Sequence, residues 1–410
     1  MVKPVTQMNR LRQSVTAHAG ARDHYQLSLA LHEAGWLNRL VTDLYAPDWL
    51  YQSAPTYAQK RYCPGLPAAK ISLSSAAFWK AGKARVLQRD YNSSIDREIS
   101  LTALRTAEKS GSNLFLYSYY AFQAFQQAER SGIANRLLFQ LHPHPLSVRA
   151  ILAEEMDRLP FASQSIRDET EFSLADSRLE GLIAEPQLAT FCITASQFTR
   201  KTLIENGVPA NQIRVIPYGV DTTAFLQRRK APSAAKFRII FVGRMNQRKG
   251  LADLLQAVRL LKSRTIEVIL CGRGYIDHSI LLEYKELTIK VYEAIAQDQL
   301  VRELHQSHVF VLPSLAEGFA HVVLEAMATG LPIITTENTC GPDVIVEGKH
   351  GYLVPIRNPE RLATLLDAAI TEQEAWFEMG RLAAVQARTF TWERFRAGIR
   401  DVYQQTVTDN

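Results

Sequence analysis

Short apolar runs alternate with amphipathic segments along the chain. In the first half, apolar runs stand at 14–17, 38–45, 113–118, 136–142, 190–195 and 213–219. In the second half, they stand at 237–243, 266–272, 288–292, 308–314 and 331–337. Runs of about four to eight residues, rich in Val, Ile and Phe and bounded by polar segments, are typical of buried strands. Each run therefore predicts a strand.

Helical patterns fill several of the intervals. They cover residues 25–36, 196–206, 250–263, 296–306, 319–330 and 392–406. Gly35 and Gly207 suit helix ends, and Ser196 is well placed to cap a helix start. The polar segment 160–187 is predicted as helix or loop. Strands that alternate with helices predict an α/β protein built in layers.

The segment after Gly219 divides the chain. It reads VDTTAFLQRRKAPSAAK and has few core-forming residues, and the strand–helix alternation restarts beyond it. A chain of 410 residues also favours two domains over one. We therefore predict two doubly wound α/β domains. Their bounds are 1–220 together with a terminal helix at 391–410, a linker at 221–235, and 236–390.

Composition is ordinary for a globular protein, with 47% hydrophobic and 21% charged residues. No run approaches the roughly 20 apolar residues that a membrane span needs, and the basic N-terminus lacks the apolar region of a secretory signal. The four cysteines are scattered and form no Cys-x-x-Cys pair. We expect reduced thiols in a cytoplasmic protein.

Positive charge gathers in residues 60–109. This segment holds ten Lys or Arg against four Asp or Glu, a surplus equal to the formal net charge of +6. Phe78 and Trp79 stand beside Lys80. Such a segment is either a solvated surface or a patch that holds the protein peripherally on the inner face of an anionic membrane. An anionic acceptor or a nucleic acid is a further partner for it, but no nucleic-acid-binding motif is present.

Two glutamates flank the apolar run EGFAHVVLEA. Glu317 follows the predicted strand 308–314, and Glu325 stands eight positions later. If a helix starts near Gly318 or Phe319, its free amides and dipole favour an anion there. A rise of ~12 Å separates the two carboxylates. They suit the two ends of a hydroxyl-rich ligand such as a sugar nucleotide, although a capping glutamate and a partly exposed one fit the spacing equally.

A second strand leads into a basic loop. The stretch FVGRMNQRKG places Gly243, Arg244, Arg248 and Lys249 before a predicted helix. Fixed cations at a helix start suit a diphosphate and the charge that develops on a leaving phosphate, although a solvated basic loop has the same composition. No Walker motif occurs, and Gly272-Arg273-Gly274 lacks the third glycine of a dinucleotide loop.

These segments together carry a family resemblance. VGRMNQRKG, ILCGRG, VLPSLAEGFAHVVLEAMATGLPIITTE and GPDVIVEGKHGYLVP resemble the retaining glycosyltransferases of family four, and so does ASQFTRKTLIENGVPANQIRVIPYGVD. The match runs over roughly 190–390. It implies the GT-B fold, in which two Rossmann-like domains face a cleft and a C-terminal helix crosses back to the first domain. The N-terminal domain would bind the acceptor, and the C-terminal domain the donor.

The resemblance also implies roles for residues. Arg244 and Lys249 would hold the donor diphosphate, Glu325 the ribose, and Glu317 the transferred sugar, with the backbone of Gly318, Phe319 and Ala320 nearby. The base would lie along Gly272 to Gly274 and the backbone around Tyr292. On the other domain, Gly20 and Ala21 resemble a loop that approaches the phosphates, although Arg22 departs from the family pattern.

A histidine pair ends the predicted strand 136–142. The family often has a histidine at the position of His142, where it lines the donor-sugar site, and His144 competes for the role. A structural histidine is the alternative, and a metal site lacks accompanying ligands.

The resemblance as a whole implies a retaining transferase that moves a sugar from a UDP- or GDP-sugar to a glycan or glycolipid acceptor in polysaccharide, lipopolysaccharide or glycolipid assembly. It implies no cofactor and no required metal. An epimerase, a phosphorylase or a non-catalytic nucleotide-sugar-binding protein can share this architecture.

Overall fold

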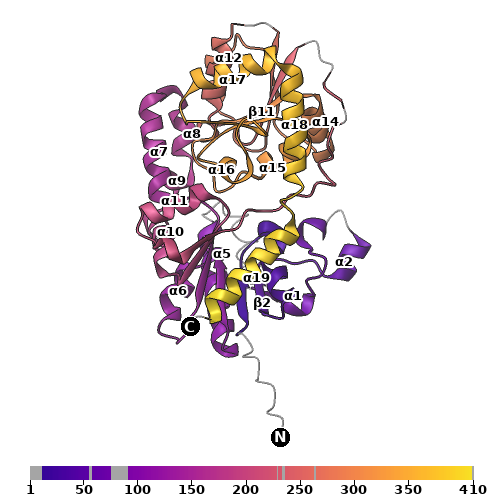
Figure 1. Cartoon of the computed structure of the whole chain (residues 1–410). Helices are drawn as coiled ribbons and strands as arrows, with labels where there is room; N and C mark the ends of the chain where they lie inside the picture. Colours follow the sequence, from indigo (N-terminus) through magenta and orange to yellow (C-terminus); the bar gives the residue numbers. More distant parts are fainter. Residues whose placement is uncertain are drawn as a thin grey trace.

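Each predicted apolar run contains a strand, and these strands lie in two separate parallel sheets (Figure 1). The strands Ile71–Leu73 and Gly351–Val354 were not predicted from the sequence. The computed structural model describes residues 12–54, 58–74, 91–228, 230–232, 236–262 and 265–408. Parallel strands covered on both faces need near-continuous apolar sequence. The strand FRIIFV shows this, because all six of its residues are buried.

The first sheet has seven strands in the order β3-β2-β1-β4-β5-β6-β7. Their bounds are β1 (Ser14–Ala17), β2 (Leu37–Thr42), β3 (Ile71–Leu73), β4 (Asn113–Tyr117), β5 (Arg136–Gln140), β6 (Phe191–Thr194) and β7 (Ile213–Val215). The second sheet has six strands in the order β10-β9-β8-β11-β12-β13. Their bounds are β8 (Phe237–Val242), β9 (Ile266–Cys271), β10 (Ile289–Tyr292), β11 (Val309–Leu312), β12 (Ile333–Thr336) and β13 (Gly351–Val354). Both orders reverse direction at one point, as in a doubly wound fold. The predicted fold class is confirmed.

Helices cover both sheets. Those in the N-terminal half are η1 (Arg22–Tyr25), α1 (Gln26–Glu33), α2 (Asp48–Ser53), η2 (Gln59–Arg61), η3 (Ala68–Lys70), α5 (Tyr91–Ser110), α6 (Phe122–Ala128), α7 (Pro145–Arg158), η4 (Pro160–Ala162), α8 (Ser163–Arg167), α9 (Thr170–Ser173), α10 (Asp176–Leu188), α11 (Gln197–Glu205) and η5 (Ala210–Gln212). Those in the C-terminal half are η6 (Gln247–Lys249), α12 (Leu251–Leu260), α13 (His278–Glu283), α14 (Gln297–Gln306), α15 (His321–Ala328), α16 (Gly341–Val344), α17 (Pro359–Thr371), α18 (Gln373–Ala387) and α19 (Trp392–Thr408).

The last helix returns to the first domain. Figure 1 shows α18 beside the second sheet and α19, in yellow, lying across the first domain next to α1. Tyr403 anchors α19 there, because its ring stacks on Trp36 and its hydroxyl accepts a hydrogen bond from Ser14 at 2.9 Å. The two segments that connect the domains are in contact, since the amide of Val220 donates to the carbonyl of Phe390 at 2.9 Å.

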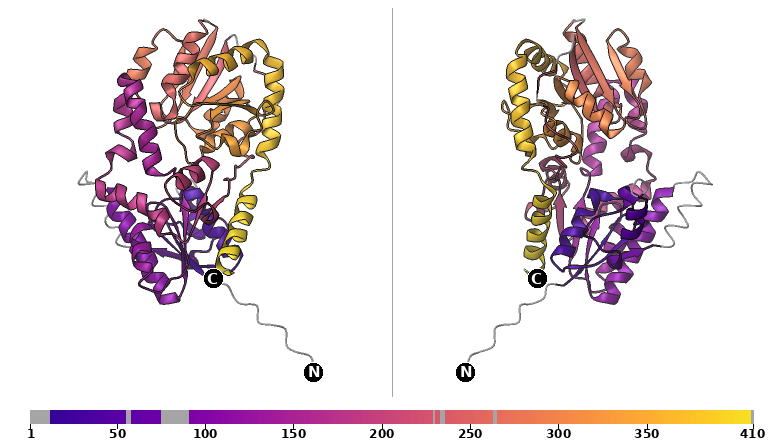
Figure 2. Two further views of the ribbon diagram at one scale, coloured as in Figure 1. Left: turned by 60° about the vertical axis from the view of Figure 1, so that its left-hand side comes forward. Right: turned by 90° about the vertical axis from the view of Figure 1, so that its right-hand side faces the viewer.

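The helix α7 extends beside the second domain, as both views of Figure 2 show. Its Glu155 is fully buried and accepts hydrogen bonds from Gln247 and Arg357, at 2.6 and 2.8 Å. Arg158 bridges Glu155 to Asp253 of α12, at 2.6 and 2.7 Å. The polar segment that the sequence left as helix or loop thus forms η4 and α8–α10, and α8 and α9 adjoin α7 in this interface.

The cysteines, the basic segment 60–109 and the expected lack of a membrane span can be compared with the described residues. All four cysteines are free and buried, as expected for reduced thiols. Residues 75–90, with Phe78, Trp79 and four of the ten basic residues of 60–109, lie outside the described residues. Arg61 of the same segment pairs with Asp43 at 3.0 Å. No helix in the described part of the chain is both long and apolar enough to cross a membrane.

Candidate active site

The two sheets turn the carboxyl ends of their strands toward a shared crevice. The strand order reverses between β1 and β4 in one sheet and between β8 and β11 in the other. Ligands in doubly wound sheets bind beyond the strands at such reversal points. The loops after these four strands begin at residues 18, 118, 243 and 313, and residues from all four line two adjoining cavities. Both cavities therefore lie where the fold favours a ligand.

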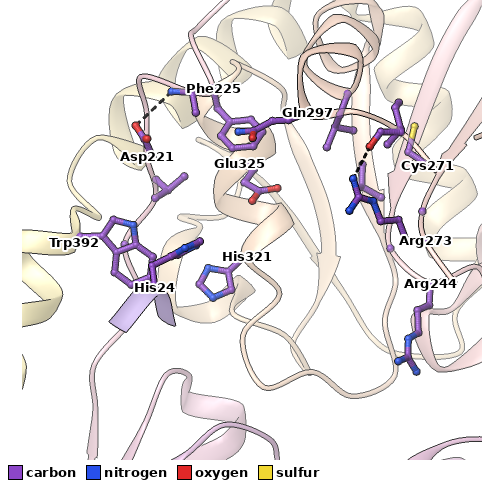
Figure 3. A pocket seen from close by; sticks show the side chains of 18 residues that line it. His24, Asp221, Phe225, Arg244, Cys271, Arg273, Gln297, His321, Glu325 and Trp392 are labelled. Atoms are coloured by element: carbon purple, nitrogen blue, oxygen red, sulfur yellow. Dashed lines mark hydrogen bonds between the residues drawn. The ribbon is translucent and has the colours of Figure 1, made fainter. Parts of the chain in front are cut away.

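The first cavity has a volume of about 620 Å³. Glu325 lies on its wall together with backbone at Gly243 and Gly272 and side chains of Arg273 and Gln297. Figure 3 shows the Glu325 carboxylate directed into the cavity, with Arg244 at the far end and Arg273 hydrogen-bonded to the Ile295 carbonyl at 3.2 Å. Gly272 allows the wall to close, because a Cβ there would lie 2.2 Å from the carbonyl oxygen of Gly243.

The second cavity has a volume of about 730 Å³ and adjoins the first. Five residues line both cavities: His24, Val242, Gly243, Arg244 and His321. Seven of the predicted site residues line only the second: Ala21, His142, Lys249, Glu317, Gly318, Phe319 and Ala320. The structure thus brings most of the predicted site into one continuous space between the domains, with Glu325 at one end and Glu317 at the other.

Glu317 and Lys249 form an ion pair within the second cavity. Ser314 also donates to Glu317 Oε1, at 2.9 Å, and the lysine bonds the same oxygen. Burial acts to raise the pKa of Glu317, but Lys249 and Arg248 outweigh it and the pKa lies below its ordinary value. Glu317 is therefore a carboxylate at neutral pH.

Arg248 is held by the N-terminal domain. Its Nη1 lies 2.9 Å from Glu169 and 3.0 Å from Glu171, and its Nε donates to the Ala316 carbonyl at 3.2 Å. Two carboxylates therefore offset one guanidinium. Arg244 differs, because it is exposed and has no ion pair within the described residues.

Gly318 touches the N-terminal domain. A Cβ there would lie 1.9 Å from the carbonyl oxygen of Leu141, so no other residue fits without movement. The Gly318 carbonyl accepts hydrogen bonds from Ser196 at 2.6 Å and Thr199 at 3.2 Å, both at the start of α11. The loop that bears Glu317 is therefore clamped between the domains.

The helix after this loop begins later than predicted. α15 starts at His321, and Ala320 before it has φ 68°. The geometry that we expected for Glu317 and Glu325 assumed one helix through both, so it is wrong: Glu317 lies in an irregular loop and only Glu325 lies on the helix. A left-handed turn at alanine cannot be read from sequence, because glycine is the residue that favours it.

The two histidines after β5 have different surroundings. His144 is buried, caps α7 by accepting from the Leu146 amide at 3.3 Å, and is structural. His142 lines the cavity, and its ring meets the edge of Tyr119 at 5.6 Å. Burial, with Arg248 and Arg22 nearby, lowers the pKa of His142 to about 3, so its imidazole is neutral.

Glu325 is the least compensated acid of the site. No hydrogen bond to its carboxylate forms within the described part of the chain, and burial raises its pKa to about 7. A carboxylate without protein donors beside a cavity is available to accept hydrogen bonds from ligand hydroxyls.

Three predicted residues line neither cavity. Gly274 follows the cavity wall in an open turn. The Tyr292 hydroxyl bonds Glu303, and its carbonyl accepts from the Gly272 amide at 3.0 Å. Gly20 lies behind Ala21, with its amide donating to Asp43 at 2.9 Å.

Other residues of the cavities were not anticipated from the sequence. They are His24, Asp221, Phe225, Gln297, His321 and Trp392, all labelled in Figure 3. His24 contacts the Trp392 ring edge-on at 5.8 Å, and His321 stacks on Tyr218 at 4.5 Å. Each of these contacts joins residues more than one hundred positions apart. The described residues contain no group of three or more His, Cys, Asp or Glu able to hold a metal ion.

Solved structures share this architecture along nearly the whole chain. Sucrose-phosphate synthase from Thermosynechococcus elongatus superposes with a TM-score of 0.65 at 18% identity, covering 97% of this chain and 100% of that one. Anabaena HepE in complex with UDP-glucose gives 0.60 at 16% identity, with the same coverage. Two Rossmann-like domains that face a cleft define the GT-B fold, which is confirmed.

Sequence comparison finds a family match in the C-terminal half. Residues 224–384 match the model of the family Glycosyl transferases group 1. A D-inositol 3-phosphate glycosyltransferase of Arthrobacter sp. (strain FB24) is 31% identical over 214 residues, 48% of this chain and 51% of that protein. The amylovoran biosynthesis glycosyltransferase AmsK of Erwinia amylovora is 28% identical over 183 residues, 42% and 45% of the two chains. The chain thus spans about half the length of these curated relatives.

Proposed function

We propose that this protein is a retaining glycosyltransferase that moves a sugar from a nucleoside diphosphate sugar to a glycan or lipid-linked acceptor. The observation that carries the proposal is the pair of adjoining cavities, with an uncompensated carboxylate, Glu325, in one and the Lys249–Glu317 pair in the other. A nucleoside diphosphate sugar needs a hydrogen-bond acceptor for its ribose, cations for its diphosphate and a polar pocket for its sugar, and the two cavities offer these side by side.

The donor would span both cavities. Glu325 would accept hydrogen bonds from the two ribose hydroxyls in the first cavity, where Arg273 and Gln297 border the base. The diphosphate would lie at the junction, beside Arg244 and the backbone of Gly243, which line both cavities. The sugar would enter the second cavity, where Glu317 Oε2 remains to accept from its hydroxyls because Lys249 and Ser314 both bond Oε1.

The cations would handle the charge of the leaving group. As the glycosidic bond breaks, negative charge develops on the diphosphate, and fixed cations stabilise that charge most where water is excluded. Arg244 and Lys249 are the side chains available for this, without a required metal ion. In a front-face displacement, the leaving phosphate oxygen takes the proton of the acceptor hydroxyl. No protein carboxylate need attack the sugar, consistent with a Glu317 engaged by Lys249 and Ser314.

His142 would shape the sugar site rather than transfer a proton. An imidazole with a pKa near 3 stays neutral throughout the physiological range. It therefore offers one donor and one acceptor to sugar hydroxyls. The clamped contact of Gly318 with Leu141 would keep the sugar between the two domains and limit hydrolysis of the donor.

The activities for which relatives are named support a role in polysaccharide or glycolipid synthesis. They include enzymes of amylovoran and colanic acid biosynthesis, and the HepE structure holds UDP-glucose. We propose a nucleotide-sugar donor and a cytoplasmic site of action on this basis. A peripheral position on the inner membrane face, through residues 60–109, remains part of the proposal and is tested by liposome flotation with and without anionic lipid.

The proposal is tested by a thermal-shift screen of nucleoside diphosphates and their sugars, followed by transfer assays. A ligand that binds only the native state raises its stability by mass action. We expect one base to stand out, Glu325→Ala to weaken nucleotide binding, and Lys249→Ala to slow transfer. Product analysis with donor alone identifies an epimerase, which needs no acceptor. The proposal fails if no nucleotide shifts the melting temperature, or if both variants retain wild-type turnover.

A further inference from the structure

The loop after β1 has an unusual backbone where it enters the second cavity. Asp23, His24 and Tyr25 have φ values of 42°, 51° and 64°. Successive left-handed residues other than glycine are sterically disfavoured, because Cβ approaches the following carbonyl oxygen, and such conformations gather at functional sites. Arg22 immediately precedes this turn and lines the second cavity. The turn thus determines how Arg22 is presented there.

Arg22 is a cation without a full set of partners. Its Nε is buried and has no hydrogen-bond partner, and no ion pair with Arg22 forms among the residues that the structure describes. Its near neighbours include the phenols of Tyr119 and Tyr120, whose pKa values burial raises. The adjacent Asp23 accepts from the Leu27 amide at 3.0 Å through Oδ2. Burial acts to lower the pKa of Arg22, but the hydrogen-bonded Tyr120, with Tyr119 and Asp96, outweighs it and raises the pKa. Arg22 is therefore a cation whose buried Nε still lacks an acceptor, which an anion in the cavity would supply.

The other cations of the second cavity already have an ion-pair partner or a place beside the proposed diphosphate. Arg248 has Glu169 and Glu171, and Lys249 has Glu317. Arg244 lines both cavities and therefore borders the junction where the diphosphate would lie, whereas Arg22 lines only the second.

Arg22 instead belongs to the far end of the site. It lies close enough to His142 and His18 to lower the pKa of both, although burial is the larger cause. His142 marks the proposed sugar site. An anion that meets Arg22 would therefore lie on the N-terminal-domain side of the transferred sugar, where an acceptor approaches.

We propose that Arg22 binds an oxyanion, a phosphate or a carboxylate, carried by the acceptor near the hydroxyl that receives the sugar. A planar guanidinium matches both groups through parallel N–H donors. The inference rests on the proposed function, because it takes the nucleotide to fill the first cavity and the junction. It adds the chemical class of the acceptor, which is anionic, and a residue that selects it.

The test uses the full chain saturated with whichever nucleoside diphosphate gives the largest thermal shift. Inorganic phosphate is then titrated by calorimetry into the saturated protein, as the smallest probe for the acceptor anion. We compare wild type with Arg22→Met, Arg22→Lys and a matched control, Arg130→Met, which removes one exposed cation of the same domain.

We expect one phosphate site per wild-type chain, at least tenfold weaker binding in Arg22→Met, an intermediate loss in Arg22→Lys, and no change in Arg130→Met. Nucleotide affinity should change less than threefold in every variant. The Lys variant keeps the charge, so the inference stays testable if Arg22→Met fails to fold.

Three results would overturn the inference. The first is phosphate binding to the saturated protein that is absent or independent of Arg22. The second is a nucleotide affinity that falls in Arg22→Met as far as in Arg244→Met, which would give Arg22 to the diphosphate. The third is an Arg22→Met variant that loses affinity for a nucleoside diphosphate glucuronate but not for the corresponding nucleoside diphosphate glucose. That result would show that Arg22 binds the donor sugar. A protein that binds no nucleotide contradicts the proposed function itself, so the two failures are distinguishable.

Discussion

Removal of Lys249 should destabilise the native protein through Glu317. The two side chains are 20% and 11% exposed. Removing one partner of a fully buried pair costs about 3–5 kcal/mol, because the other charge remains buried and unpaired. Ser314 and Arg248 still support Glu317 in Lys249→Met, and the cavity admits water. We therefore expect a loss of about 2 kcal/mol, or roughly 4–8 °C in melting temperature for a domain of this size.

A double-mutant cycle separates this effect from ordinary loss of packing. Lys249→Met, Glu317→Gln and the double variant are compared with wild type by thermal and urea unfolding of the full chain. The double variant removes both charges, so it should be more stable than the sum of the single losses predicts, by about 1 kcal/mol or more. Single losses that simply add, or that each stay below about 0.5 kcal/mol, would show that the two groups are not coupled and would refute the reasoning.

Three further predictions follow from the same contacts. Because the pKa of Glu325 is raised to about 7, its ionised fraction rises about tenfold from pH 6 to 8; nucleotide-sugar affinity by calorimetry should rise with it, and Glu325→Gln should bind weakly without that pH dependence. Gly318→Ala brings a methyl group against Leu141, so it should lower domain stability by about 1–3 kcal/mol and reduce transfer; unchanged melting and turnover would contradict the clamp. Glu185 accepts from three backbone amides at the start of α6, so Glu185→Gln should cost about 2 kcal/mol in urea unfolding, while the exposed Glu180→Gln should cost almost nothing.

Buried strands were predictable because their signal is local. In a run such as FRIIFV, consecutive apolar residues indicate that both faces of the strand are buried. Helices with mixed surfaces were less visible. The 20 residues of α5 and the 14 of α7 were not assigned from the sequence. α7 buries Glu155, a charged residue, between the domains, and a hydrophobic pattern does not show this.

The site was predictable only in part, for a physical reason. Glu317 and Lys249 are 68 positions apart, and the resemblance assigned each a role without foretelling their ion pair. Arg22 and His24 are placed in the cavity by a left-handed turn of non-glycine residues, and no local sequence pattern predicts the φ values of that turn. Trp392 reaches the cavity because the chain returns from the last helix pair, which is a property of the whole fold.

The central claim is that a nucleoside diphosphate sugar spans the two adjoining cavities. A crystal structure of the protein with the nucleotide found in the thermal-shift screen tests this most directly. We predict ribose hydroxyls hydrogen-bonded to the Glu325 carboxylate and a diphosphate in contact with Arg244 and Lys249. A nucleotide bound elsewhere, with Glu325 turned to solvent and Lys249 still engaged only by Glu317, would contradict the account.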